Sequence, residues 1–121
     1  MTIREKGTYR GLIVWQKAMD LVDLVYDYTS EFPSVERFTL QSQMRRCAIS
    51  IPSNIAEGKR RSTKNEFNHF LKIAFGSGGE LETQLEIARR RDYGNTRKRE
   101  KAELLLDEVM RMLNKMIDNR S

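Results

Sequence analysis

Apolar residues recur every three or four positions through most of this chain, and no other feature constrains its fold as strongly. That spacing places apolar side chains on one face of an α-helix, whereas a half-buried strand would alternate them with polar ones. Four stretches carry the pattern, and polar, glycine or proline connections separate them. The pattern therefore predicts four helices, over about residues 14–32, 39–58, 63–91 and 96–119, after a flexible lead-in over residues 1–12.

Glycines interrupt the third stretch at Gly76, Gly78 and Gly79. Each glycine in a helix interior is about 1 kcal/mol less favourable than alanine, so a loop is an alternative interpretation. The apolar spacing nevertheless keeps its phase from Phe67 to Ala88, which an intervening loop would normally disrupt. We therefore expect one long helix, whose small residues let a neighbouring helix approach closely.

Local sequence signals predict where the second helix bends, where the third begins and which residues of the fourth face the core. Pro52 lies inside the second apolar pattern, where a missing backbone donor predicts a kink. Thr63 and Glu66 have the spacing of a capping box, in which each side chain satisfies a backbone donor of the other, so the third helix should begin there. In the fourth stretch the apolar row is Ala102, Leu105, Val109, Met112 and Met116.

Short connections force consecutive helices to pack side by side in opposite directions. The expected fold is an all-α, antiparallel, up-down-up-down four-helix bundle, with a single domain over residues 1–121. Apolar side chains cover more of the first and fourth helices than the arc of roughly 100° that a monomeric bundle needs. We expect self-association through this surplus, with a thick core as the alternative. The candidate subunit contacts are Trp15, Tyr26 and the outer Leu and Met residues of the fourth helix, such as Leu104 and Met110.

The composition is that of a soluble, largely helical protein. Hydrophobic residues make up 39% of the chain and charged residues 32%, with only 2 prolines. No apolar run approaches the roughly 20 residues that cross a bilayer, and the first residues lack the apolar segment of a signal peptide. We therefore expect cytoplasmic residence and no membrane partner.

Residues that support catalysis are sparse. The single Cys47 and the single His69 cannot form an ordinary zinc site, which needs about four such ligands. We expect Cys47 to be a small core residue and His69 to be a packed or surface-edge side chain. The best paired carboxylates, Glu80, Glu82 and Glu86, lack the Glu-x-x-His motif of metal sites in bundles. No Gly-Lys-Ser/Thr follows the glycine run, as a phosphate loop would require. We expect no enzymatic activity, no catalytic residue, no metal and no cofactor.

Positive charge is concentrated where the third and fourth helices should meet. Between Arg89 and Lys101, seven basic residues outnumber two acidic ones, a surplus of +5 that equals the net charge of the chain. The helix dipole stabilises cations at the end of the third helix but disfavours them at the start of the fourth, which indicates an anionic partner. The candidate nucleic-acid-binding residues are Arg97, Lys98, Arg99, Lys101, Arg89, Arg90 and Arg91 at this end, and Lys59, Arg60, Arg61 and Lys64 at the opposite end.

Three interpretations of these basic residues remain open. Arginine matches phosphate with two parallel hydrogen bonds, so the first is binding of structured RNA or DNA through backbone phosphates. The second is an acidic protein partner docked on the same end, and the third is a solvated surface without a partner. Direct binding of purified RNA distinguishes the first from the second.

Several motifs resemble one known family. They are Val14-Trp15-Gln16-Lys17-Ala18, Phe32-Pro33, Gln43-x-Arg45-Arg46, Ser50-Ile51-Pro52-Ser53-Asn54-Ile55-Ala56-Glu57-Gly58, Glu66-Phe67-x-x-Phe70-Leu71-x-Ile73-Ala74-x-Gly76-Ser77 and Glu80-Leu81-Glu82-Thr83-Gln84-Leu85. In their order along nearly the whole chain they resemble the bacterial four-helix-bundle proteins encoded in intervening sequences of 23S ribosomal RNA genes. Gly78 and Gly79 depart from the family pattern, in which bulkier residues such as Leu and Ala are expected.

This resemblance carries its own implications. It implies a four-helix protomer that assembles into a ring-shaped homopentamer. The family is similar to the accessory variability determinant of diversity-generating retroelements, a basic pentamer that binds nucleic acid and a reverse transcriptase. The resemblance therefore implies that an acidic partner of the basic end would be a reverse-transcriptase-like enzyme.

Overall fold

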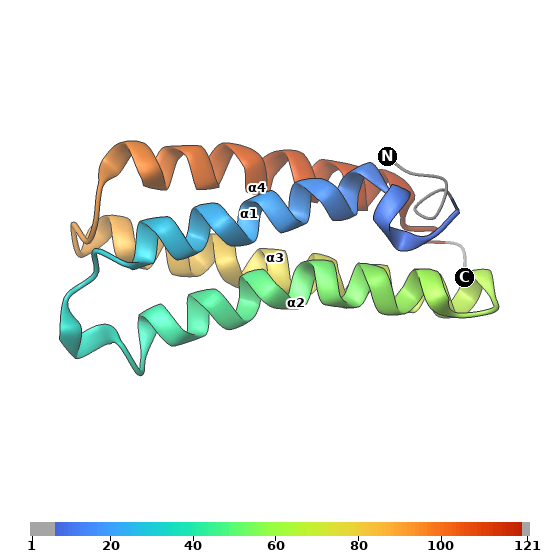
Figure 1. The fold of residues 1–121 in the computed structure, drawn as a ribbon, viewed down its shortest axis with the longest axis horizontal. Helices are drawn as coiled ribbons and strands as arrows, with labels where there is room; N and C mark the ends of the chain where they lie inside the picture. Colours follow the sequence, from blue (N-terminus) through green and yellow to red (C-terminus); the bar gives the residue numbers. More distant parts are fainter. Residues whose placement is uncertain (1–6, 120–121) are drawn as a thin grey trace.

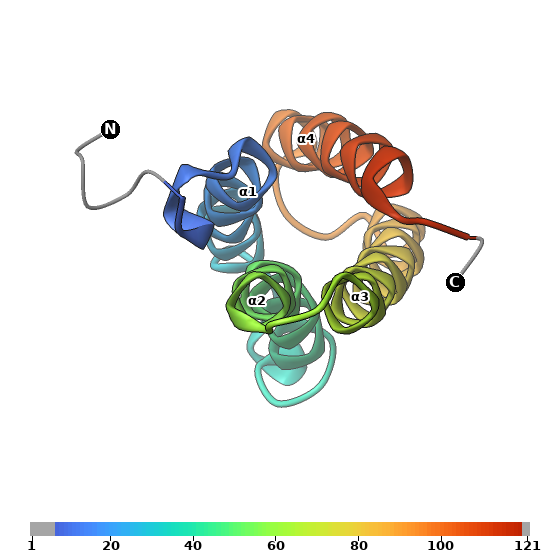
Figure 2. The ribbon, with the colours of Figure 1, turned by 90° about the vertical axis from the view of Figure 1, so that its right-hand side faces the viewer.

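The computed structural model of the chain describes residues 7–119, over which it has four α-helices and no strand. The four-helix, all-α prediction is confirmed over this range. Figure 1 shows each helix running back along the one before it, and Figure 2 shows the four helices around a common centre. The helices are α1 (Ile13–Thr29), α2 (Leu40–Arg60), α3 (Lys64–Arg90) and α4 (Thr96–Met116), with short 3₁₀ helices at Tyr9–Gly11 and Ser34–Glu36.

The core lies between the helices, and each helix gives it one row of buried side chains. Most residues of the rows predicted for α1, α2 and the middle of α3 are buried, but Val22 of α1 and Leu40 of α2 are only partly buried. In α4, however, Leu106 and Leu113 are buried, whereas the predicted Leu105, Met112 and Met116 are only partly buried. The largest fully buried side chains are Tyr28, Leu21, Met44, Ile51, Ile55, Leu71, Leu81, Leu85, Leu106, Leu113, Val14 and Val25.

The first helix ends at Thr29, before the predicted end at residue 32. The Thr29 hydroxyl donates to the Val25 carbonyl at 2.8 Å and accepts from Arg45 Nε at 2.9 Å, so its side chain is held at the helix end. Pro33 disfavours helical backbone at the residue before it. Phe32 is therefore buried from the connection, with its ring against Tyr28 at a centroid separation of 5.0 Å.

The last helix ends at Met116, before the predicted end at residue 119. Asn68 of α3 holds the following segment, because its side-chain amide donates to the Asp118 carbonyl at 2.8 Å and its side-chain oxygen accepts from the Asp118 amide at 2.7 Å. Ile117 is already extended, with φ −71° and ψ 128°. The paired hydrogen bonds replace those that another helical turn would have formed.

The third helix continues through its glycines, as the apolar spacing predicted. A Cβ atom on Gly78 would overlap the sulfur of Met110 in α4, so the expected close approach of a neighbouring helix occurs at this glycine. A Cβ on Gly76 or Gly79 would meet nothing within 4 Å. Only Gly78 is therefore explained by helix packing.

The remaining local predictions have mixed outcomes. The second helix continues through the buried Pro52. The Thr63 hydroxyl oxygen accepts a hydrogen bond from the Glu66 backbone amide at 3.1 Å, as the capping box requires. The Glu66 carboxylate accepts from the Thr63 hydroxyl and not from the Thr63 backbone amide, so only half of the capping box forms. The expected flexible lead-in contains the 3₁₀ helix at residues 9–11, and its residues 1–6 lie outside the described range. Within residues 7–119, no helix combines the length and apolar character that crossing a membrane requires.

Candidate nucleic-acid interface

The predicted basic residues lie at the two ends of the bundle. The turn end is the end that carries the connections at residues 30–39 and 91–95, drawn on the left of Figure 1. The opposite end carries the connection at residues 61–63. The turn end brings together Arg89, Arg90, Arg91, Arg97, Lys98, Arg99 and Lys101, whereas Lys59, Arg60, Arg61 and Lys64 lie at the opposite end.

The start of α4 disfavours positive charge at the turn end. Asn95 caps the helix, since its side-chain oxygen accepts the Lys98 backbone amide at 3.0 Å. Asp92 and Gly94, with φ values of 58° and 70°, reverse the chain just before it. The first turn of α4 contains no acidic residue. Cations there face the positive end of the helix dipole, which costs roughly 0.3–1 kcal/mol each.

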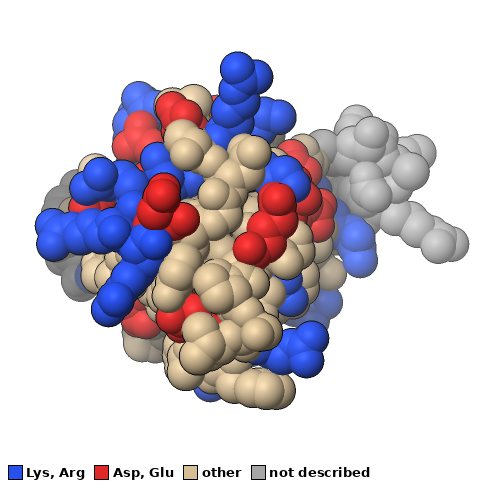
Figure 3. All heavy atoms as spheres, turned by 90° about the vertical axis from the view of Figure 1, so that its left-hand side faces the viewer, with Lys and Arg blue, Asp and Glu red and all other residues tan. Residues whose placement is uncertain are grey.

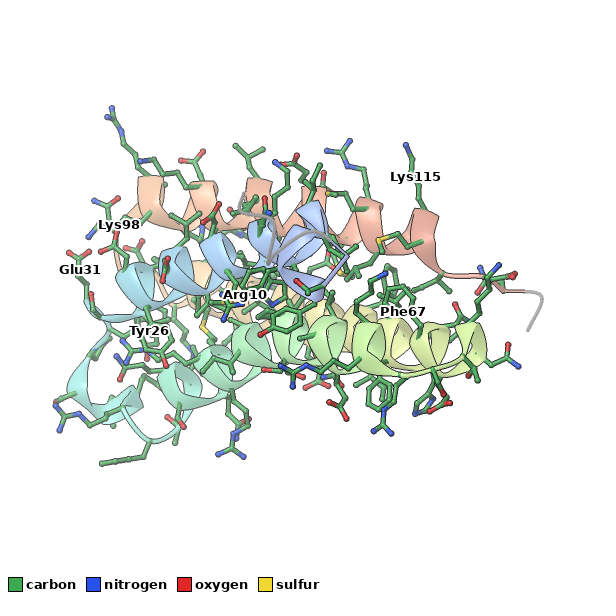
Figure 4. All side chains as sticks on the ribbon, turned by 45° about the vertical axis from the view of Figure 1, so that its right-hand side comes forward. Arg10, Tyr26, Glu31, Phe67, Lys98 and Lys115 are labelled. Carbon is green, nitrogen blue, oxygen red and sulfur yellow. The ribbon has the colours of Figure 1, made fainter. Side chains whose placement is uncertain are left out.

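Lys98 is compensated within the bundle. Its Nζ lies 2.9 Å from Glu31 Oε1 and 3.2 Å from Asp27 Oδ1, both beside the end of α1. Hydrogen bonds to Glu31 and then Asp27 raise the pKa of Lys98. Figure 4 shows Lys98 and Glu31 together at this end. Lys98 therefore joins α1 to α4 and carries no free charge toward a ligand.

Arg99 turns inward. Its side chain is 12% exposed, and its Nε lies 3.5 Å from Glu103 Oε1 and donates no hydrogen bond to any described residue. The neighbouring Tyr28 is buried, which raises its pKa, and the charge of Arg99 opposes that effect. The Tyr28 hydroxyl donates to the Tyr93 carbonyl at 2.8 Å, so this group ties α1 to the α3–α4 connection.

Arg89 and Arg90 share one carboxylate. Arg89 donates two hydrogen bonds to Glu86, at 2.8 Å and 2.7 Å, and Arg90 donates one at 2.9 Å. The bonds from Arg89 and then Arg90 lower the pKa of Glu86 to about 2. These pairs lie in solvent, where screening leaves them little effect on stability. The single charge of Glu86 offsets one of the two positive charges of Arg89 and Arg90.

Three of the seven cations remain uncompensated. Arg91, Arg97 and Lys101 are exposed, and none forms an ion pair with any residue in the range 7–119. Figure 3 shows the turn end face-on, with an uncharged band across its middle and acidic groups among the basic ones. The basic surface is therefore smaller and more broken than the sequence count suggests.

Cations at the opposite end lie against aromatic rings. Arg61 pairs with Glu57 at 2.7 Å and also lies over the Phe70 ring, 4.9 Å from its centroid. Arg60 lies 5.0 Å from the Tyr9 centroid, and Lys59 lies 5.9 Å from that of Phe67. Within the part of the chain that the structure describes, Lys59, Arg60 and Lys64 form no ion pair.

The candidate subunit contacts divide between core and surface. Leu106 and Leu113 belong to the core, so part of the wide apolar face of α4 is explained inside the bundle. Leu104 remains 73% exposed on α4, and Tyr26 remains 40% exposed on α1. Trp15 is only half-buried and lines a groove of about 330 Å³ between α1 and α2.

The residues considered for chemistry are packed or scattered. Cys47 is buried as predicted, and burial raises the pKa of its thiol. His69 is exposed, and its ring lies edge-on to that of Phe70 at a centroid separation of 5.3 Å. No group of three or more His, Cys, Asp or Glu side chains is arranged to hold a metal ion in the described range.

Sequence reasoning missed an apolar pair at the turn end. Phe38 is 85% exposed and Val35 is 77% exposed, both in the connection between α1 and α2. Helical periodicity gives no information about side chains in a connection, so spacing arguments could not find them. The available signal was the presence of large apolar residues in a polar connection, although Phe32 in the same connection is buried.

Comparisons with known proteins agree with the fold. No curated protein matches the chain. A crystal structure of a protein of unknown function from the S23 ribosomal protein family of Bacteroides thetaiotaomicron VPI-5482 has a TM-score of 0.78 and 23% identity, covering 88% of this chain and 100% of that one. At this identity the likeness concerns the fold alone. The model of the family described as 23S rRNA-intervening sequence protein matches residues 10–115, nearly the whole chain, and the protein therefore belongs to that family.

Proposed function

We propose that this protein is a non-enzymatic, oligomeric binding protein that contacts the phosphates of structured RNA or DNA through its turn end. The observation that carries the proposal is the placement of Arg91, Arg97 and Lys101. They stay exposed, without an acidic partner in the described range, around a helix start that disfavours cations. A phosphate backbone offsets the mutual repulsion of these cations and the repulsion of Arg97 by the dipole of α4.

The geometry favours contacts to phosphates over contacts to base edges. Arg97 and Lys101 are four residues apart and share one face of α4, and Arg91 lies across the connection. Side chains at a helix end reach a phosphate backbone readily, and the free amides at a helix start also attract anions. We therefore assign phosphate contact to these three of the seven candidates that the sequence suggested at this end.

The test is RNA binding by the purified protein. A labelled structured RNA is followed by fluorescence anisotropy across a salt series, for the wild type and for a variant with Ala at Arg91, Arg97 and Lys101. We expect micromolar or tighter wild-type binding, and a loss of affinity of about tenfold or more in the variant. Because each lost phosphate contact reduces counterion release, the slope of log K against log salt should fall by roughly 2–3.

A second variant provides the matched control. Ala at Lys59, Arg60 and Lys64 removes the same charge from the opposite end, again from cations without an ion pair in the described range. It should bind RNA nearly as well as the wild type. No binding at low salt, or equal losses in both variants, would contradict phosphate binding at the turn end.

The oligomeric part of the proposal rests on the exposed apolar residues of α1 and α4. Leu104→Glu should lower the particle mass measured by light scattering, because a charge cannot be buried in an apolar subunit contact without a large penalty. Val35→Glu, at a position 77% exposed in the connection, is the control and should leave the mass unchanged. The resemblance to pentameric proteins suggests five subunits of 14.2 kDa. A wild-type monomer at micromolar concentration would contradict the proposal.

A protein scaffold that docks an acidic partner, such as a reverse-transcriptase-like enzyme, is the second candidate. The exposed Phe38 and Val35, at an end whose surface carries charges of both signs in Figure 3, support it, since protein interfaces combine apolar residues with a polar rim. If RNA does not bind at low salt, this candidate becomes the leading one.

A further inference from the structure

Phe38 is the most exposed of the large apolar side chains in the described range, at 85%. Val35, at 77%, projects from the same connection at the turn end. A single exposed apolar residue is ordinary in a soluble protein. Two of them within four residues, one of them an aromatic ring, indicate a contact surface. No aromatic ring or cation stacks on the Phe38 ring anywhere in residues 7–119, so both of its faces are available.

The connection that carries Phe38 is fixed by Glu36. One Glu36 oxygen accepts from the Thr39 hydroxyl at 2.6 Å, and the other accepts from the Tyr93 hydroxyl at 2.9 Å. These two bonds, in that order, lower the pKa of Glu36, which keeps the carboxylate ionised near neutral pH. Phe38 therefore lies between two residues joined through their side chains, in a segment tied to the α3–α4 connection. The backbone that carries the ring therefore loses little freedom when the ring binds.

The same tie places the connection that carries Phe38 near Arg91, one of the three cations without an ion pair. Tyr93 lies between Arg91 and Arg97 in the sequence, and Arg91 is near enough to Glu36 to help lower its pKa. Arg37, next to Phe38, is exposed and forms no ion pair with a described residue. The exposed ring thus has two exposed arginines, Arg37 and Arg91, on the two connections that Glu36 joins. A ring beside cations is the combination that binds a nucleic-acid strand by stacking a base and holding its phosphates.

We infer that Phe38 is a stacking platform for an unpaired nucleobase, and that the RNA bound at the turn end is single-stranded where it meets this ring. The inference rests on the proposed function. A base inside a duplex has both faces covered by its neighbours, so only an unpaired base can lie on the ring. Arg37 and Arg91 hold the phosphates beside that base.

The experiment compares a short labelled RNA of mixed sequence with the same RNA annealed to its complement. Wild type should bind the single strand more tightly than the duplex. Phe38→Ala should weaken single-strand binding by roughly 5- to 150-fold, the range of one lost stacking contact, and leave duplex binding unchanged. Val35→Ala is the matched control, which shortens an equally exposed apolar side chain without removing a ring, and it should change affinity less than threefold.

A second variant tests stacking directly. Phe38→Trp should retain single-strand affinity, and single-stranded RNA should quench its added fluorescence. The wild type, whose only tryptophan is Trp15, provides the blank. Circular dichroism confirms that each variant remains helical.

The contrary outcomes are distinct. If wild type binds RNA and Phe38→Ala binds the single strand equally well, the stacking platform is excluded while phosphate binding stands. Equal losses in Phe38→Ala and Val35→Ala would show a non-specific apolar contact and overturn the inference. A smaller particle mass for Phe38→Ala would make the residue a contact between copies, with the same consequence. If the wild type binds neither RNA, both the inference and the proposed function fail.

Discussion

Leu81→Ala should lower the free energy of unfolding by about 2–5 kcal/mol, with a fall in the thermal midpoint on the order of 10 °C. Leu81 is fully buried in the middle of α3, and Gly78, one turn earlier, brings Met110 of α4 close to the same helix. Removing three carbon atoms there loses their transfer free energy and leaves a cavity that rigid helices fill only in part.

Urea unfolding followed by circular dichroism measures this effect. All samples need one protein concentration, because self-association would add stability that depends on concentration. Val35→Ala, which shortens a side chain 77% exposed in a connection, should stay within about 0.5 kcal/mol of the wild type. A loss below about 1 kcal/mol for Leu81→Ala would mean that the α3 row does not face the core.

The helices were predictable because their signal is local. A row of apolar residues at helical spacing identifies a buried face wherever the chain turns next, which is why α3 could be followed through its glycines. The apolar spacing did not identify the buried face of α4, because it was ambiguous there. Leu104, Leu105 and Leu106 offer three successive phases, and the neighbouring helices select Leu106 for the core.

The ends of the helices depended on distant partners. Asn68 ends α4 through hydrogen bonds to a residue 50 positions away, and no pattern near residue 118 indicates that contact. The end of α1 is set in part by Arg45, which comes from the next helix. Side-chain pairs of this kind form only after the helices have packed, so the sequence alone could not specify them.

In the candidate site, too, one part could be predicted from the sequence and another could not. Connectivity was enough to place seven cations at one end, because helix order and short connections decide which ends meet. Their charge balance was not predictable. Lys98 is compensated by Asp27 and Glu31, which are 71 and 67 residues away in the sequence. Arg99 is buried against Glu103 only because α1 covers it through Tyr28.

The glycines of α2 and α3 offer a sharper test of the packing, since the same substitution should have opposite effects at two of them. A Cβ on Gly58 would lie 2.8 Å from the Cβ of Phe70 and 3.2 Å from the backbone oxygen of Phe67. Those atoms belong to the α3 backbone or adjoin it, so they can yield only if the helices separate. Gly58→Ala should therefore destabilise the protein by about 1–3 kcal/mol, despite a gain in helix propensity of up to about 1 kcal/mol.

Gly79→Ala adds the same methyl group to a helix where nothing lies within 4 Å. Only the propensity gain remains, so this variant should be more stable than the wild type by about 0.5–1 kcal/mol in the same urea experiment. Stabilisation by both substitutions would mean that α2 and α3 lie further apart at Gly58 than the structure shows. Opposite signs would establish that Gly58 is required by the approach of α3, while Gly79, although it lies in the same unusual run as Gly78, is not required for packing within the bundle.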